Sequence, residues 1–391
     1  MNDTLQELMR SATRLTQAGR LNEATETIQR MLRGAAATPD MPNLTKAWTT
    51  GAGAVPVQQG ATPEASPLVL DGCVFEVKAP APAAPTAPAS RTGTGTGTGE
   101  FIAGTHTHAS LTRNFKLFVP PGHAGRQLPL VVMLHGCTQN PDDFAAGTGM
   151  NQRAREQGFF VLYPEQSQDA NPSRCWNWFK HNHQKRGSGE PALLANMTQA
   201  VMKQHDIDPR RVFIAGLSAG GAMAAVVGAA YPEIFAAVGV HSGLPSGAAS
   251  NVAEALMVMK SGEGGMVMPG KSRRPGTAPK VALRPEKPVP TIVFHGDQDT
   301  TVHPRNGEQV IAAVLGSVAS VPQVEKGVSA KGRHYTRSTH RAEKGHVLTE
   351  HWLVHGAGHA WSGGLAAGSY TDARGPDATQ EMLRFFFEQV R

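Results

Sequence analysis

One serine placed between two glycines is the first feature of this chain that indicates chemistry. The stretch "GLSAG" occupies residues 216–220, after the apolar run "VFIA" and before the small residues "GAMAA". A Gly-x-Ser-x-Gly pattern between a strand and a helix is typical of a nucleophile elbow, a strained turn that holds a serine hydroxyl clear of a sheet. The pattern predicts nucleophilic attack by Ser218 on a carbonyl carbon. The alternative is an ordinary tight turn.

A serine hydroxyl is a weak nucleophile, so it needs a general base that is oriented by a third group. In proteins with such an elbow, the acid and then the histidine follow the serine along the chain. The segment "FHGDQDTTVHP" offers Asp297 and Asp299, and the later segment "VHGAGHAWSGG" offers His355 and His359. Both segments come directly after apolar runs, where the active sites of open α/β sheets lie.

We expect Asp299 and His359 to complete the triad. Each residue lies deeper in its loop than its competitor, and Gly356 and Gly358 give the second loop room to reach the serine. The alternatives are that an aspartate of the first loop caps a turn and that His359 is a packed loop histidine.

The developing oxyanion needs two backbone N–H donors. We expect one from Ala219, directly after the nucleophile, and one from Cys137, in the loop that follows "VVMLHG". His135 is better explained by packing or by bracing of this loop. No HExxH or comparable spacing supports a metal ion, and the predicted mechanism needs no cofactor.

Several apolar runs bounded by loops predict the strands that position these residues. They alternate with helical patterns at about residues 190–204 and 377–391. This alternation predicts a mostly parallel sheet with helices on both faces. The expected strands are "LPLVVML", "GFFVLYP", "RRVFIAGL", "FAAVGVH", "VPTIVFHG" and "HVLTEHWLVHG".

The rest of the chain predicts appendages to one catalytic domain over residues 105–391. Residues 1–34 repeat apolar side chains at steps of three and four, which indicates short helices. Residues 35–104 are rich in Pro, Ala, Gly and Thr, which favours a flexible linker. Residues 246–288 are expected to form a flexible basic insertion.

Composition limits the partners. The chain has 391 residues and a formal net charge of +6, but no nucleic-acid-binding motif accompanies the basic stretches. We therefore expect no nucleic acid as partner. No apolar run reaches the length of a transmembrane helix, so we expect no membrane as partner either. The charged first residues lack the apolar core of a signal peptide, which favours a cytoplasmic location. The three cysteines allow one disulfide or three free thiols, and the oligomeric state stays open.

Several segments together resemble the poly(3-hydroxybutyrate) depolymerase-like esterases, α/β-hydrolases related to feruloyl and acetylxylan esterases. The segments are "LHGCTQNPDDFAAGTGMN", "CWNWF", "GLSAGGAMA", "HGDQDTTVHP" and "GHAWSGG". The resemblance covers about residues 105–391 and implies the triad Ser218, Asp299 and His359. It also implies a disulfide between Cys137 and Cys175, with Cys73 as the odd thiol, and an extracellular location as the alternative compartment.

These observations predict a serine carboxylesterase for a small-molecule or oligomeric ester. The expected substrates are short-chain, hydroxyalkanoate-type or aryl (feruloyl-like) esters. The alternatives are a polyhydroxybutyrate depolymerase, or a peptidase or acyltransferase that uses the same triad. Trp176 and Trp361 lie beside motif residues and are expected to line the substrate site, the alternative being that they are core residues.

Overall fold

A computed structural model describes residues 98–262, 288–316, 318, 320–342 and 345–391. The helices expected at 1–34, the linker as far as residue 97, and Cys73 lie outside the described residues. Within the described part of the chain, no helix has the length and apolar character needed to cross a bilayer.

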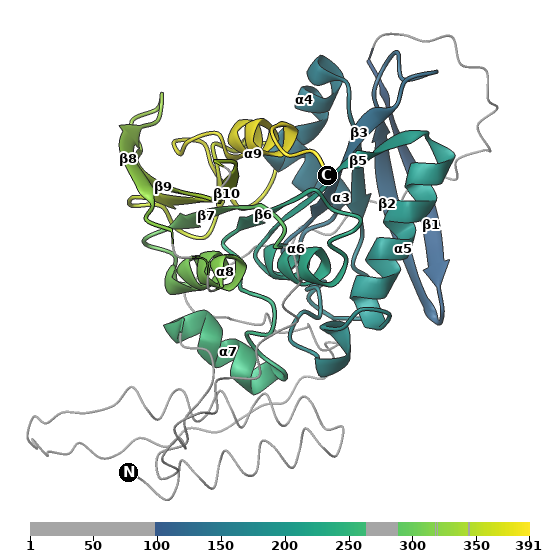
Figure 1. Cartoon of the computed structure of the whole chain (residues 1–391). Coiled ribbons are helices and arrows are strands. Elements are labelled where there is room, and N and C mark those ends of the chain that lie inside the picture. Colours follow the sequence, from purple (N-terminus) through teal and green to yellow (C-terminus); the bar gives the residue numbers. More distant parts are fainter. Residues whose placement is uncertain (1–97, 263–287, 317, 319, 343–344) are drawn as a thin grey trace, which may run out of the picture. The chain divides into compact units, whose positions relative to one another are not determined.

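A ten-stranded sheet forms the centre of the domain, with strand order β1-β2-β4-β3-β5-β6-β7-β10-β9-β8 (Figure 1). The central strands β4, β3, β5, β6, β7 and β10 are all parallel, and antiparallel strands extend both edges. The strands are β1 (Glu100–His108), β2 (Leu111–Val119), β3 (Leu128–Leu134), β4 (Phe160–Pro164), β5 (Ile207–Leu217), β6 (Ala237–His241), β7 (Thr291–Gly296), β8 (Gln323–Val328), β9 (His334–Arg341) and β10 (Val347–Val354), with a small separate pair β11 (Trp361–Ser362) and β12 (Thr371–Asp372).

Helices cover both faces of this sheet. One face carries α5 (Gly189–Gln204), α6 (Ala219–Ala230), α7 (Val252–Ser261) and α8 (Arg305–Leu315), and the other carries α3 (Pro141–Thr148), α4 (Met150–Gln157) and α9 (Ala378–Phe387) (Figure 1). A short 3-10 helix, η1 (His181–His183), precedes α5. The predicted fold class, a mostly parallel sheet with helices on both faces, is confirmed.

Alternation along the strands explains why two cores form. Leu130, Val132 and Leu134 of β3 pack into the core under α5 and α6, whereas Val131 and Met133 pack into the core under α9. Successive side chains of a strand point to opposite faces, so a strand covered on both sides must be apolar throughout. The six apolar runs of the sequence form β3, β4, β5, β6, β7 and β10 for this reason.

The polar outer strands differ from the expectations. β1 begins at Glu100, five residues before the expected domain boundary at 105, and all nine of its residues pair with β2. β8 and β9 were not among the predicted strands because β8 is almost wholly exposed. Hydrogen bonding of the backbone to a neighbour, rather than apolar burial, determines such strands, so their sequences carry a weak signal.

The insertion expected over residues 246–288 is partly helical. The Asn251 side chain accepts a hydrogen bond from Glu254 N–H and caps α7, and Gly262 ends it in a left-handed conformation. Ala255 and Val258 of this helix are buried, and Asn306 of α8 donates to the Val258 carbonyl at 2.9 Å. Tertiary packing therefore orders residues 252–261, whereas residues 263–287 lie outside the described part.

A disulfide joins the loops that follow β3 and β4. Cys137 and Cys175 form this bond, the pairing that the family resemblance implies, across a sequence separation of 38 residues. Both loops lie at the carboxyl ends of neighbouring parallel strands, which brings the two cysteines together. Closing a loop of this length restricts the unfolded chain and contributes about 4 kcal/mol by chain entropy.

We predict that reduction of the Cys137–Cys175 bond lowers Tm by several degrees. Thiol titration of the denatured, unreduced protein is expected to find one free thiol, with Cys137 and Cys175 linked in the peptide map. A Cys73→Ser variant is the matched control and is expected to keep both the bond and the Tm. Three free thiols, or a linkage through Cys73, would contradict the assignment.

Candidate active site

Ser218 occupies a strained turn between β5 and α6. Its backbone has φ 57° and ψ −120°, a conformation that residues other than glycine rarely adopt. A Cβ atom at Gly220 would collide with the Leu134 carbonyl oxygen, and one at Gly216 would collide with the backbone of Gly220. The two glycines therefore let α6 start directly against β3 and β5. This geometry is that of a nucleophile elbow.

Asp299 lies in the loop after β7, and His359 lies in the loop after β10. His359 Nδ1–H donates to Asp299 Oδ2 at 2.7 Å. The other carboxylate oxygen, Oδ1, accepts hydrogen bonds from the backbone N–H groups of Thr301 at 2.9 Å and Val302 at 2.8 Å. Asp299 is only 5% exposed, so its charge is compensated by fixed donors rather than by water.

The Asp299 carboxyl is held ionised. Burial by itself raises its pKa, but interactions with His295 and His359 outweigh burial and hold the pKa well below its ordinary value. An ionised carboxylate only accepts hydrogen bonds, so the proton of neutral His359 resides on Nδ1. The lone pair of Nε2 is then left to act as a base.

A second Asp–His pair lies close by in the same two loops. His355 Nδ1 donates to Asp297 Oδ2 at 2.9 Å, and Asp297 Oδ1 accepts from Gly356 N–H at 2.7 Å. The difference lies at the other ring nitrogen, because His355 Nε2 contacts Thr336 Oγ1 at 2.9 Å. Both ring nitrogens of His355 are thus occupied, which favours a role in joining the two loops over a role as a base.

The structure brings Asp299 and His359 together and places Ser218 in its elbow, all at the carboxyl edge of the parallel strands. In the described residues, no hydrogen bond joins Ser218 Oγ to His359. Nucleophile–base hydrogen bonds are often long before substrate binds and tighten in the complex. The hydrogen bond between Asp299 and His359 agrees with the predicted acid and base. For Ser218, the agreement lies in its backbone conformation at the turn.

The two residues expected to supply oxyanion donors, Ala219 and Cys137, lie in segments next to the serine. Ala219 is the first residue of α6, whose N-terminus favours negative charge. Gly136, which precedes Cys137, lies so close that a Cβ atom on it would be 3.7 Å from Ser218 Cβ. Among the backbone hydrogen bonds of the described residues, neither Ala219 N–H nor Cys137 N–H is a donor. Both are therefore available to an oxyanion.

His135 braces the loop that carries Cys137, as expected. Its Nδ1–H donates to the Gly136 carbonyl at 2.7 Å, and its Nε2 accepts from Gln166 N–H at 3.1 Å. Gln139 adds a second brace, because its Oε1 accepts from Gly136 N–H at 2.9 Å. Burial lowers the pKa of His135 to about 4, so the ring stays neutral at pH 7 with its proton on Nδ1.

The two tryptophans expected to line the substrate site are buried. Trp176 is 0% exposed and packs near the His135 ring, and Trp361 is 1% exposed and stacks on His241 at 5.1 Å between ring centroids. Trp361 Nε1 donates to Thr379 Oγ1 at 3.0 Å, which ties it to α9. Both indoles act as core residues here, the alternative considered for them, and present no surface to a ligand.

Sequence reasoning missed two buried histidines near the site, His295 beside Asp299 and His241 at the end of β6. His295 Nε2–H donates to the Val302 carbonyl at 2.7 Å and lies 3.5 Å from Asp299 Oδ2. His241 Nε2 accepts from Ser362 N–H at 2.9 Å, and burial lowers the pKa of His241 to about 3. Their signal in the sequence is a histidine at the end of an apolar strand, in "FHG" and "VHS". Within the described residues, no cluster of three or more His, Cys, Asp or Glu side chains could hold a metal ion.

We predict that the free energy of unfolding decreases as the pH falls from about 6.5 to 4. Burial lowers the pKa of His135 and His351 from 6.5 to about 4 and that of His241 to about 3. The unfolded chain therefore binds more protons in this window, and stability falls on acidification. The depressed carboxyl pKa of Asp299 acts in the same direction only at lower pH, below the ordinary pKa of an aspartate.

Urea unfolding at pH 8, 6.5, 5.5 and 4.5 measures this effect. His351→Gln is expected to flatten the pH dependence, because it removes one histidine whose lowered pKa contributes to that dependence. His334→Gln, at an exposed position, is the matched control and is expected to leave the pH dependence unchanged. A midpoint that stays constant from pH 8 to 4.5 would contradict the prediction.

Comparison with known proteins agrees with this geometry. A family model described as "Esterase PHB depolymerase" matches residues 113–326, more than half of the chain. Poly(3-hydroxyalkanoate) depolymerase C of Paucimonas lemoignei is 30% identical over 257 residues, which cover 63% of this chain and 58% of that protein. A probable acetylxylan esterase A of Aspergillus fumigatus is 28% identical over 234 residues, 55% of this chain and 59% of that protein.

Among solved structures, the acetyl xylan esterase from Aspergillus awamori has the same fold, with a TM-score of 0.53 at 21% identity over 71% of this chain and 94% of that one. The chain spans about three fifths of the length of the curated relatives named above. The family match and the elbow of an α/β-hydrolase sheet together establish that this chain belongs to the PHB depolymerase family of esterases.

Proposed function

We propose that this chain is a serine carboxylesterase whose triad is Ser218, His359 and Asp299. The observation that carries the proposal is the 2.7 Å bond between His359 Nδ1 and the buried Asp299 carboxylate. It fixes the tautomer in which His359 Nε2 is a base, on the same sheet edge as the Ser218 elbow. Membership of an esterase family supports the same reaction class.

In the first half of the proposed reaction, Ser218 Oγ forms a bond to the ester carbonyl carbon while His359 Nε2 takes its proton. The carbonyl oxygen becomes an oxyanion that accepts hydrogen bonds from Cys137 N–H and Ala219 N–H. The tetrahedral intermediate then breaks its bond to the alcohol oxygen, and His359 gives the proton to the departing alcohol. Asp299 stabilises the imidazolium that exists between the two proton transfers.

In the second half, water replaces the alcohol. His359 Nε2 takes a proton from the water as its oxygen attacks the acyl carbon, and a second oxyanion forms at the same N–H groups. Its collapse breaks the bond to Ser218 Oγ, releases the carboxylic acid and returns the proton to the serine. The chain's own groups suffice for this sequence of proton transfers.

The proposed substrates are short-chain and hydroxyalkanoate-type esters, with aryl esters of the feruloyl type as a further class. The names of the relatives, a poly(3-hydroxyalkanoate) depolymerase and an acetylxylan esterase, support small acyl groups. Attack on the polymer itself, peptide hydrolysis and acyl transfer by the same triad are the alternatives that product analysis distinguishes. The Cys137–Cys175 disulfide favours an oxidising compartment outside the cytoplasm over the cytoplasmic location.

We predict that Ser218→Ala abolishes hydrolysis of p-nitrophenyl acetate and p-nitrophenyl butyrate. Loss of a triad nucleophile lowers kcat by about 10³-fold or more, whereas the fold is expected to remain, because alanine fills less space. Ser250→Ala, at an exposed position, is the matched control. The rates are measured on protein whose circular dichroism matches the wild type, and near-normal activity of Ser218→Ala would refute the mechanism.

We also predict that Asp299→Asn damages catalysis far more than Asp297→Asn. An amide at 299 cannot stabilise the imidazolium and permits the wrong His359 tautomer, so kcat is expected to fall by about 10³-fold or more. An amide at 297 weakens only the pair that joins the two loops, for which less than about a tenfold loss is expected. The ratio of the two kcat values is the measurement. A crippled Asp297→Asn beside an active Asp299→Asn would reassign the acid.

A further inference from the structure

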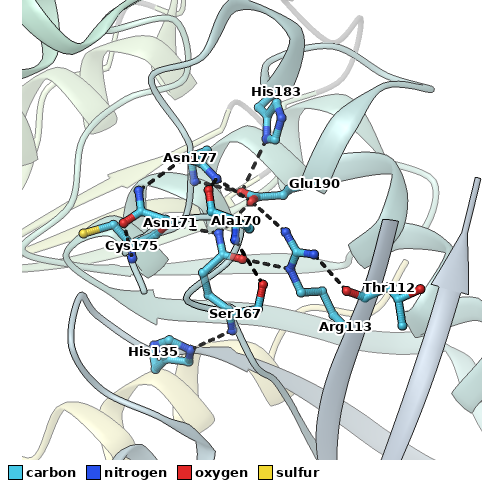
Figure 2. Close-up of polar contacts among 11 residues, drawn as sticks. Thr112, Arg113, His135, Ser167, Ala170, Asn171, Cys175, Asn177, His183 and Glu190 are labelled. Atoms are coloured by element: carbon cyan, nitrogen blue, oxygen red, sulfur yellow. Dashed lines mark hydrogen bonds and ion pairs between the residues drawn. The ribbon is translucent and has the colours of Figure 1, made fainter. Parts of the chain in front are cut away.

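Glu190 is a wholly buried carboxylate in the first turn of α5. Its Oε1 accepts hydrogen bonds from Gln166 Nε2 at 2.6 Å and Asn177 Nδ2 at 2.7 Å, and Arg113 Nη2 lies 3.4 Å away. Its Oε2 accepts from Asn177 N–H at 2.8 Å and lies 3.4 Å from His183 Nδ1. Figure 2 shows these side chains converging on Glu190 from several loops and from β2.

The surrounding donors keep this buried carboxylate ionised. Burial alone raises the pKa of Glu190, but the interaction with His183 and the hydrogen bonds from Gln166 and Asn177 lower it below its ordinary value. A buried ionic group contributes little to net stability, because its loss of hydration offsets its attraction to partners. Stability alone is therefore a weak reason for a carboxylate at 0% exposure.

Gln166 connects Glu190 to Cys175 of the disulfide and to His135, which lies two residues before Cys137. One N–H of its Nε2 donates to Glu190, and the other donates to the Cys175 carbonyl at 3.0 Å. Its Oε1 accepts from Arg113 Nε at 2.8 Å, so every polar atom of the side chain is used. Its backbone N–H donates to His135 Nε2 at 3.1 Å, a contact that Figure 2 also shows.

His135 connects the backbone of Gln166 to the peptide between Gly136 and Cys137. Because its Nε2 accepts a hydrogen bond, its proton lies on Nδ1 and is donated to the Gly136 carbonyl at 2.7 Å. The Gly136 C=O and the Cys137 N–H belong to the same planar trans peptide and point in opposite directions. The hydrogen bond that holds the carbonyl thus sets the direction of the Cys137 N–H.

We propose that Glu190 is a positioning residue for the oxyanion hole, acting through Gln166 and His135 on the Gly136–Cys137 peptide. The proposal rests on the proposed esterase function, since it assigns a remote support to one of the two N–H donors. Glu190 touches no reacting atom. Its effect is on the stability of the tetrahedral intermediate, in which the carbonyl oxygen carries negative charge.

Glu190→Gln tests the proposal with little change in volume. Whichever way the amide is turned, its N–H₂ group faces a donor. This donor is Gln166 or Asn177 Nδ2 at the Oε1 position and Asn177 N–H at the Oε2 position, so at least one contact becomes repulsive and the network shifts. A misdirected oxyanion donor lowers kcat by about tenfold, less than the loss of a donor outright, with KM nearly unchanged. The Ki of phenylboronic acid, which forms a tetrahedral adduct on the serine, is expected to rise by a similar factor. A residue with only a structural role would not move kcat and this Ki together.

Glu233→Gln is the matched control. Glu233 is an exposed carboxylate that pairs with Arg186 at 2.6 Å, and it takes no part in the network of Figure 2. Its kcat and its Ki for phenylboronic acid are expected to stay within twofold of the wild type. Active sites are counted by titration with a fluorophosphonate, so that kcat refers to folded, competent protein only.

The outcomes separate this inference from the proposed function. Wild-type kcat and Ki in Glu190→Gln, beside an inactive Ser218→Ala, would overturn the positioning role and leave the esterase intact. Absence of Ser218-dependent hydrolysis in the wild type would instead refute the proposed function. If Glu190→Gln does not fold, Gln166→Met decides by the same readouts, because it removes the side-chain bonds to Glu190 and Cys175 and keeps the backbone N–H.

Discussion

The close approach of α6 to β3 and β5 is the constraint on which the site depends. It exists because Gly216 and Gly220 carry no side chains at points where a Cβ atom would collide with backbone. The approach forces Ser218 into a conformation with positive φ and brings the N-terminus of α6 to the carboxyl edge of the sheet. The strained backbone is that of Ser218, the proposed nucleophile. The packing of α6 in the core maintains this conformation.

Two buried carboxylates show how the interior is arranged around that elbow. Asp299 and Glu190 are almost inaccessible to water, and each has several fixed donors aimed at it. Asp299 accepts a hydrogen bond from His359, the proposed base, whereas Glu190 is linked through Gln166 to Cys175. A buried anion with fixed donors cannot shift without leaving a donor unpaired, so both groups hold in place the segments that donate to them.

The two Asp–His pairs show that residue types alone do not assign a role. Asp299–His359 and Asp297–His355 come from the same loops and have similar hydrogen-bond lengths of 2.7 and 2.9 Å. They differ at Nε2, which in His355 contacts Thr336 and in His359 has no protein partner among the described residues. His355 thus has partners at both ring nitrogens, whereas His359 keeps the Nε2 that the proposed base requires.

By itself, the sequence determined the fold class, the family, the elbow at Ser218 and the order in which an acid and a histidine follow it. It could do so because buried parallel strands must be apolar throughout and because only glycine fits the elbow, and both constraints leave local patterns. The exposed strand β8, the half-buried strand β9, the start of β1 and the helix α7 left weak patterns, since their order comes from neighbours rather than from their own side chains. Only the tertiary structure decided that Trp176 and Trp361 are core residues and that His359 differs from His355. It also decided that Gln166 connects Glu190 to His135 and Cys175. These facts depend on contacts between residues far apart in the chain. The packing of strands and loops decides which side chains meet, and the spacing of residues along the chain does not record it.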